Sequence, residues 1–169
     1  MAGLGVSRAL CVALLLCSPV LMGGIGRTTN FNERLLNAHN RERAMVASPM
    51  LEWDPRLAAS AAHYAKELGR TGKFEHSDTA EGENLWAGTP GHYTPEAMVG
   101  LWAAEKKHFK RGRFPDNSTT GDVDDIGHYT QLVWRRSGKV GCAVARSTAE
   151  EVLVCRYSEP GNTLGELPF

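Results

Sequence analysis

The stretch at 140–157, VGCAVARSTAEEVLVCRY, decides the fold of this chain. Both of its ends are rich in β-branched and apolar side chains, as strands are, and they flank the polar segment STAE at 147–150. This pattern predicts an antiparallel hairpin. If the turn lies at the centre of the polar segment, Cys142 stands opposite Cys155. The Cα atoms of directly opposed residues lie ~4.5–5.5 Å apart, which is within the Cα–Cα range of a disulfide.

The chain begins with an apolar segment typical of a signal peptide. Arg8 is the only charged side chain in this segment, an apolar run follows at 9–16, and small residues at 24–26 suit cleavage by a signal peptidase. We therefore predict a signal peptide at 1–26 and a mature domain at 27–169. The apolar run is shorter than the about 20 residues that a membrane span needs, and a retained anchor helix is the alternative.

Removal of that segment changes the cysteine content and the charge. Cys11 and Cys17 leave with it, and the remaining pair, Cys142 and Cys155, is expected to form a disulfide in an exported protein. The mature chain keeps 18 Lys+Arg (19 minus Arg8) against 19 Asp+Glu, a net charge near −1. This balance does not point to nucleic acid or to an anionic membrane surface as a partner, and no transmembrane segment is expected after signal removal.

Helix signals dominate the first half of the mature chain and strand signals dominate the second. Three segments begin with a residue that commonly caps a helix N-terminus, at Asn30, Asp54 and Thr94. Strand patterns follow at 128–134, 140–145 and 151–157. The expected fold class is α+β, with helices packed on a small antiparallel sheet in one domain.

Four side chains stand where local patterning gives them no role: His76, Glu83, Glu105 and His128. Each has a plain alternative, because a histidine can cap a loop or lie on the surface, and a glutamate can accept backbone N–H bonds or reach water. The sequence has no short metal-binding spacing such as His-Glu-x-x-His and no Gly-x-Ser-x-Gly elbow. A cysteine nucleophile is excluded once the remaining pair is bonded.

Four segments resemble the signatures of the CAP superfamily, which comprises cysteine-rich secretory proteins, antigen 5 and pathogenesis-related 1 proteins and is also called the SCP domain. They follow one another in order and span nearly all of the mature chain. The resemblance implies a three-layer α-β-α sandwich with a small antiparallel sheet between helices. The segments are HNRER at 39–43, GENL at 82–85, GHYTQLVWRRS at 127–137 and LVCRYSEPGN at 153–162.

The resemblance also implies a site. The family's cleft tetrad of two histidines and two glutamates maps onto His76, Glu83, Glu105 and His128, and in some relatives this tetrad binds a divalent metal, notably zinc. Two imidazoles with nearby carboxylates suit zinc, and an open cleft leaves room for water.

Further expectations follow from the same resemblance. Asn40 and Arg43 would be structural and tie the first helix to the core, and Cys142–Cys155 matches a disulfide common in the family. Certain relatives bind sterol through an aromatic, Pro-containing loop before the first of the two long signatures. Here the corresponding loop at 109–115 has few aromatic residues and mixed charge, so it gives only a weak indication of lipid or sterol binding.

The function we expect is that of a secreted, non-catalytic extracellular binding module for a small ligand or an extracellular partner, with a His/Glu cleft able to hold a divalent metal. The alternative is a zinc-dependent hydrolase or peptidase in which the metal activates water and Glu83 or Glu105 acts as the base. A structural or envelope-associated protein with an unliganded cleft is a third hypothesis. All three place the mature chain outside the cytoplasm, in the periplasm if the source is a Gram-negative bacterium.

Overall fold

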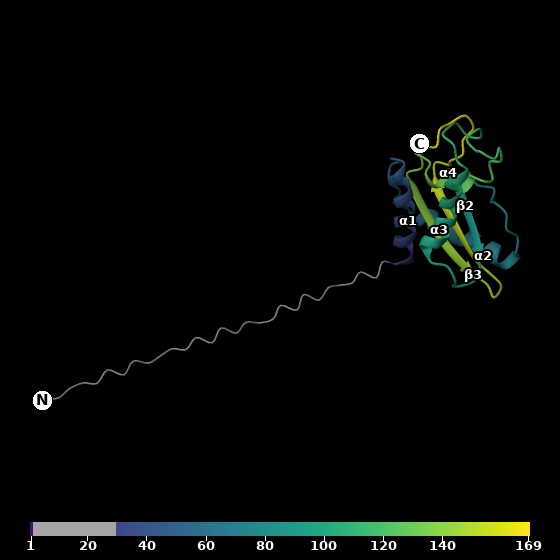
Figure 1. Ribbon diagram of the computed structural model, residues 1–169. Coiled ribbons are helices and arrows are strands. Elements are labelled where there is room, and N and C mark those ends of the chain that lie inside the picture. The colour runs from purple at the N-terminus through teal and green to yellow at the C-terminus, as the bar shows by residue number, and fades with distance from the viewer. Residues whose placement is uncertain (2–29) are drawn as a thin grey trace.

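The computed structural model describes residue 1 and residues 30–169 (Figure 1). The predicted signal peptide at 1–26 lies outside the described residues apart from Met1, and so does the start of the predicted mature domain. Among the described residues, no helix is both long enough and apolar enough to cross a bilayer.

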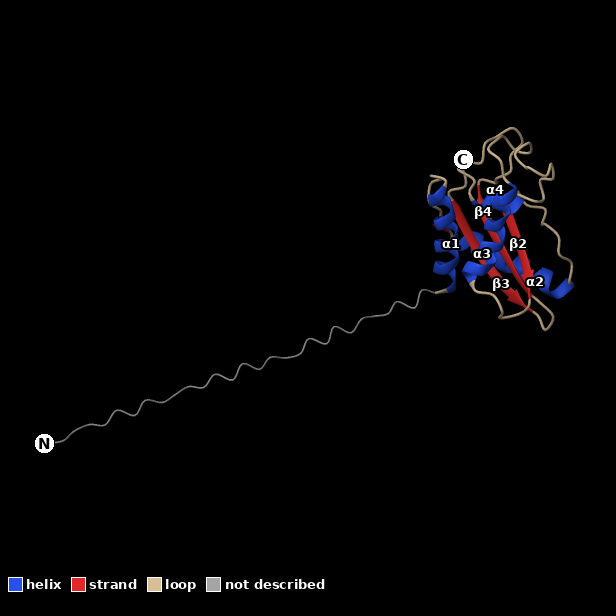
Figure 2. Cartoon of the chain, in the orientation of Figure 1, coloured by secondary structure: helices blue, strands red, loops and turns tan. Residues whose placement is uncertain are grey.

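The described chain folds into four α-helices, one short 3-10 helix and four strands (Figure 2). The strands form one sheet in the order β1-β3-β4-β2. The pairs β3–β4 and β2–β4 are antiparallel, and the two-residue β1 adds a parallel pair at the β3 edge. In chain order the elements are α1 (Phe31–Met45), β1 (Glu52–Trp53), α2 (Pro55–Thr71), β2 (Gly82–Gly88), α3 (Pro95–Ala104), η1 (Glu105–His108), α4 (Gly127–Leu132), β3 (Lys139–Arg146) and β4 (Glu151–Ser158).

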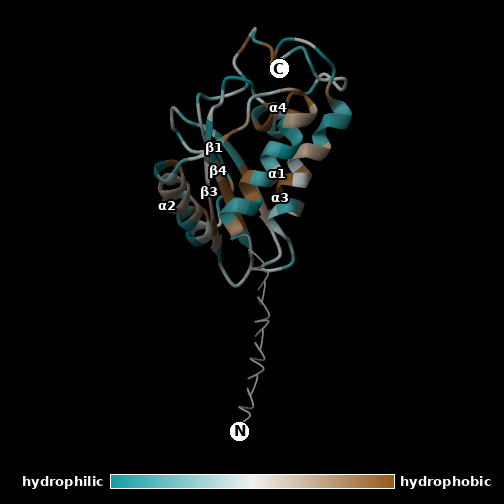
Figure 3. Ribbon diagram, turned by 90° about the vertical axis from the view of Figure 1, so that its left-hand side faces the viewer, coloured by the Kyte–Doolittle hydropathy of each residue, from teal (hydrophilic) through white to brown (hydrophobic). Residues whose placement is uncertain are grey.

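Helices cover both faces of the sheet, which confirms the three-layer α-β-α sandwich. In Figure 3, α2 lies on one side of the strands while α1 and α3 lie on the other. Each layer has its own core, since β4 sends alternate side chains to opposite faces. Val152 and Val154 pack with Ala61 and Ala65 of α2, whereas Leu153 belongs to the core shared with α1, α3 and α4.

The predicted hairpin and its disulfide are confirmed. Cys142 is the register partner of Cys155 in the β3–β4 pair, and the two are bonded. The neighbouring Gly141 faces α2 at very close range, because a Cβ at this position would collide with the backbone of Asp54 and Ala58. Only glycine lets the helix approach the strand this closely.

The predicted helix starts are also confirmed. The Asn30 side chain accepts a hydrogen bond from the Glu33 N–H at 2.9 Å, and Asp54 accepts one from the Arg56 N–H at 2.8 Å. At the end of α2, Gly72 takes the left-handed conformation that closes many helices.

The strand predicted at 128–134 is wrong, because this segment begins with α4. The aromatic and β-branched residues there favour a strand locally, but long-range contacts override that preference. The carboxylate of Glu105 accepts hydrogen bonds from the N–H groups of His128 and Tyr129 at 2.9 and 3.0 Å, and these donors have no partner inside the helix. A strand that local patterning did not predict, β2, runs through the Gly-Glu-Asn segment instead.

Two residues of α1 bind the segments that precede β1 and β3, in the positions where the resemblance implies structural roles. Asn40 exchanges two hydrogen bonds with the backbone of Leu51, at 3.0 and 2.8 Å. Arg43 is fully buried. Its guanidinium donates to four backbone carbonyls at 2.6–3.1 Å, those of Pro49, Leu132, Trp134 and Ser137.

One turn before Arg43, His39 links three elements through its ring. Its Nδ1 lies 2.8 Å from the Leu35 carbonyl oxygen, which can only accept, so Nδ1 carries the proton. Its Nε2 therefore accepts from the Tyr157 hydroxyl at 2.9 Å, and that hydroxyl in turn accepts from the Asn84 amide at 3.2 Å. Burial lowers the pKa of His39 to about 4 and raises that of Tyr157 above its usual range.

We predict that Arg43→Met lowers the unfolding free energy by at least ~3 kcal/mol, because four buried carbonyls lose their donor. Denaturant titration of both proteins measures the difference. The matched control is Arg41→Met, which removes the same charge from an exposed position of the same helix and should change stability little. Equal effects of the two substitutions would contradict the role given to Arg43.

We also predict that His39 makes the fold acid-sensitive. The folded-state pKa of His39 lies below the ordinary value of about 6.5, so the unfolded chain binds the extra proton first as the pH falls. The stabilisation is complete above pH ~6.5 and is lost progressively toward pH ~4, by about 3 kcal/mol in total. Unfolding titrations at several pH values should show this loss in the wild type, and the part due to His39 should be absent from His39→Gln.

Candidate functional site

A cavity of about 410 Å³ opens between β2, the first turn of α4 and the loops that surround them. Its polar lining comes from segments far apart in the chain, and apolar side chains complete the walls. The polar residues include His76, Glu83, Asn84, Asp124, His128 and Asn162, and the apolar ones are Phe74, Leu85, Phe114 and Val123.

The first histidine of the cavity is held by a buried carboxylate. His76 follows α2 in a loop, and its side chain is 62% exposed, whereas Glu83 on β2 is only 5% exposed. The His76 Nδ1 lies 2.7 Å from Glu83 Oε1. Ser77 adds two more bonds to the same carboxylate, from its N–H at 3.1 Å and from its hydroxyl at 2.7 Å.

Glu83 is kept ionised by this set of donors. Burial by itself raises the pKa of Glu83, but the hydrogen bonds from His76 and Ser77 and the nearby Arg156 guanidinium outweigh it, and the pKa lies below its ordinary range. Glu83 is therefore an anion that accepts hydrogen bonds at neutral pH.

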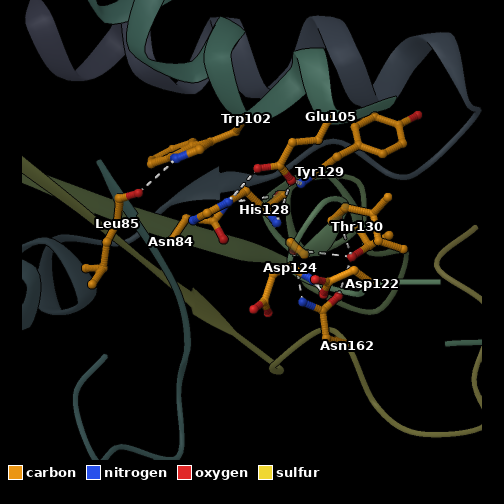
Figure 4. A network of polar contacts seen from close by, with 12 residues as sticks. Asn84, Leu85, Trp102, Glu105, Asp122, Asp124, His128, Tyr129, Thr130 and Asn162 are labelled. Carbon is orange, nitrogen blue, oxygen red and sulfur yellow. Dashed lines mark hydrogen bonds and ion pairs between the residues drawn. The ribbon is translucent and has the colours of Figure 1, made fainter. Parts of the chain in front are cut away.

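The second histidine of the cavity, His128, pairs with a carboxylate that comes from a helix rather than from a strand. Glu105 is the first residue of η1, and its Oε1 lies 2.6 Å from Nδ1 of His128 in the first turn of α4. The other oxygen of Glu105 accepts the two backbone N–H groups at the start of α4. Figure 4 shows this pair beside Trp102, whose ring stacks on the His128 ring with an interplanar angle of 8°.

The structure therefore arranges the four predicted residues as two His–Glu pairs. His76, Glu83 and His128 line the cavity, while Glu105 supports His128 from behind and is not part of the lining. Glu105 is the residue that follows the last turn of α3. That helix ends at Ala104, and the Glu105 side chain is 20% exposed.

Within the described chain, only one group of three histidine, cysteine or acidic side chains has its ligand atoms within metal-binding distance of one another, and it lies outside the cleft. It consists of His39, Cys142 and Cys155. The two cysteines are bonded to each other, so they have no thiolate to offer a metal. The His39 ring is also committed on both nitrogens.

Sequence reasoning missed several residues of the cleft. Asp124 lines the cavity from the polar loop at 116–126, whose sequence does not indicate which residue faces the cleft. In the view of Figure 4, Asp124 lies across from Glu105 with His128 between them. Asn162 holds the start of α4 by accepting from Thr130 Oγ1 at 2.6 Å, and its only signal was its place in the last signature.

Comparison with known proteins bears on this architecture. The family model described as "CAP: Cysteine-rich secretory protein family" matches residues 36–157. Pathogenesis-related protein 1A of Nicotiana tabacum is 38% identical over 144 residues, covering 85% of this chain and 83% of the relative. Pathogenesis-related protein 1 of Arabidopsis thaliana is 37% identical over 135 residues, covering 79% and 80%.

A solved structure shares the fold. The crystal structure of NaASP2 with Zn²⁺ superposes with a TM-score of 0.72 at 22% sequence identity, covering 86% of this chain and 88% of that one. At this identity the similarity shows the fold, whereas the family model and the relatives in plants match the sequence itself. The chain therefore belongs to the CAP family, the cysteine-rich secretory protein family.

Proposed function

We propose that this CAP-family protein is an extracellular binding module whose cleft holds a divalent metal, zinc by the chemistry of its donors, between His76 and His128. The observation that carries the proposal is the pairing of each histidine with a carboxylate through Nδ1, at 2.7 and 2.6 Å. A carboxylate can only accept, so in the neutral ring Nδ1 carries the proton and Nε2 keeps its lone pair.

This arrangement is the one that metal-binding histidines use. A histidine that ligates a metal commonly donates its other ring N–H to a carboxylate, which orients the ring and raises its basicity. Both imidazoles line one cavity. In this assignment Glu83 and Glu105 orient the ligands, which modifies the expectation that all four side chains bind the metal directly.

The donor set fits zinc in its chemistry. Neutral imidazole nitrogen is a preferred zinc ligand, and a cleft open to water can supply further ligands. Asp124 adds a carboxylate to the same lining. A bound zinc ion would provide a Lewis acid that an electron-pair donor of an extracellular ligand could reach.

The engagement of the two glutamates supports a binding role over hydrolysis. A general base needs a carboxylate that can take up a proton near neutral pH. Both oxygens of Glu83 and both of Glu105 already accept hydrogen bonds. The lowered pKa of Glu83 makes it a still poorer proton acceptor.

An extracellular location agrees with the disulfide and with the secretory family. Disulfides persist in oxidising compartments. The Cys142–Cys155 bond and the membership in a family described as secretory support export, and the apolar segment at 9–16 supplies a signal for it. We therefore assign residues 1–26 to the signal peptide and 27–169 to the CAP domain.

We predict that the metal-free protein binds zinc and that His76→Ala and His128→Ala each weaken binding at least ~10-fold. Calorimetric titration at pH 7.5 measures the affinities, with His63→Ala on the exposed face of α2 as the matched control. Wild-type affinity should fall at pH 5.5, because protonated imidazole cannot bind a metal. Equal affinity in the wild type and both cleft variants would remove these histidines from the site.

We predict that secreted protein begins between about residues 22 and 30, because a signal peptidase cuts after small residues such as those at 24–26. N-terminal sequencing of material from the culture medium reads the start directly. Replacing two leucines of the apolar run with arginine should block export, whereas two conservative replacements with valine should not. A secreted chain that starts at Met1 or Ala2 would contradict the assignment.

A further inference from the structure

Arg156 on β4 buries a guanidinium directly behind the His76–Glu83 pair. Its side chain is 6% exposed. One amino group donates to Glu81 at 3.0 Å. The other donates to the Ser77 hydroxyl at 3.0 Å and lies 3.3 Å from Glu83 Oε2. The guanidinium therefore contacts the two carboxylates that flank the start of β2 and the residue that follows His76.

The orientation of this guanidinium is set by those contacts. Its Nε is buried, and within the described residues it has no hydrogen-bond partner. An unpaired buried donor costs free energy. The side chain nevertheless keeps the pose that directs both amino groups at Glu81, Ser77 and Glu83, with its Cζ 5.4 Å from the centre of the Tyr64 ring.

The two arms of the cleft are supported by different means. Glu105 is fixed by the backbone N–H groups of His128 and Tyr129, which belong to the fold itself. Glu83 accepts one backbone N–H, that of Ser77, and is otherwise held by side chains: the Ser77 hydroxyl donates to it, and the Arg156 guanidinium donates to that hydroxyl and lies 3.3 Å from Glu83 Oε2. The carboxylate of the His76 arm therefore relies in part on the side chain of one β4 residue, Arg156, whereas the carboxylate of the His128 arm is held by two backbone donors.

We propose that Arg156 is the positioning residue of the His76 arm: it orders Ser77 and the Glu83 carboxylate so that Oε1 of Glu83 accepts the proton of His76 Nδ1 and Nε2 stays free for a ligand. The inference rests on the proposed metal-binding cleft for its consequence, but the ordering of the His76 ring is a property of the metal-free protein. Without Arg156, Ser77 loses a donor to its hydroxyl and Glu83 loses the cation that matches its buried charge.

The test uses Arg156→Gln, with Arg34→Gln as the matched control. Arg34 likewise pairs with a glutamate, making a bidentate bond to Glu96, but it does so away from the cleft. Ring-nitrogen NMR of the metal-free proteins at pH 8 reports the tautomer of each histidine. We expect the Nδ1–H form of His76 to give way to a mixture in Arg156→Gln, while His128 keeps its wild-type signals and Arg34→Gln changes neither ring.

Zinc titration gives the second readout. We expect Arg156→Gln to weaken binding by ~10-fold or more, as substitutions behind a metal ligand commonly do. In the His76→Ala background, Arg156→Gln should weaken zinc binding by less than a further ~2-fold, because Arg156 acts through His76. If Arg156→Gln fails to fold, Ser77→Ala, which removes the hydroxyl bridge from a partly exposed loop, should show the same His76-specific change in smaller measure.

Three results would overturn the proposal: an unchanged His76 ring in Arg156→Gln or Ser77→Ala, equal disturbance of His76 and His128, or a full additional loss of affinity in the His76→Ala background. Failure of the proposed function is separable from these. A wild-type protein that binds no zinc would defeat the metal site, whereas the tautomer of His76 would still show whether Arg156 orders the ring.

Discussion

Arg43 carries a charge into the interior and shares it among backbone carbonyls rather than with a carboxylate. Burial lowers the pKa of Arg43 to about 10, so the group is charged at neutral pH. A buried cation is tolerated only when its donors are satisfied, and here the carbonyls of Leu132, Trp134 and Ser137 have to converge on it. The path of the chain leaving α4 is thereby set from α1.

The start of α4 is tied to the same helix face by another route. His39 lies four residues before Arg43, so both side chains project from one side of α1. The His39–Tyr157–Asn84 series of hydrogen bonds reaches the His128 carbonyl, to which Asn84 donates at 3.0 Å. The placement of His128 in the cleft thus depends on a polar network inside the core, which explains how residues far apart in the sequence come to share one site.

The sequence predicted correctly those helices and strands that are determined by residues close together in the chain. The N-caps at Asn30 and Asp54 and the hairpin with its disulfide needed only neighbouring residues or a short turn. The segment at 128–134 was misassigned because its helix depends on Glu105, which is 23 residues away from His128. The start of β2 at Gly82 has a comparable cause, since its strand partner is Tyr157 at the far end of the chain.

The candidate site shows the same limit. The resemblance named four side chains, but it could not show that they form two pairs, or that Glu105 stands behind His128. Those facts depend on the end of α3 at Ala104 and on the direction of α4. Arg156 and Asp124 escaped notice because an arginine on a strand and an aspartate in a polar loop have no local pattern that separates them from surface residues.

The close approach of α2 at Gly141 has a consequence for the alignment of the strands. If β3 slipped by one residue along β4, either Val140 or Cys142 would occupy the place of Gly141, and its Cβ would meet the backbone of Asp54 and Ala58. The same slip would part Cys142 from Cys155 and turn every side chain of the strand to the opposite face. The steric constraint at Gly141 and the Cys142–Cys155 bond therefore favour the same strand alignment. The backbone at the start of α2 therefore excludes a misaligned hairpin sterically, and this exclusion operates even before the disulfide forms.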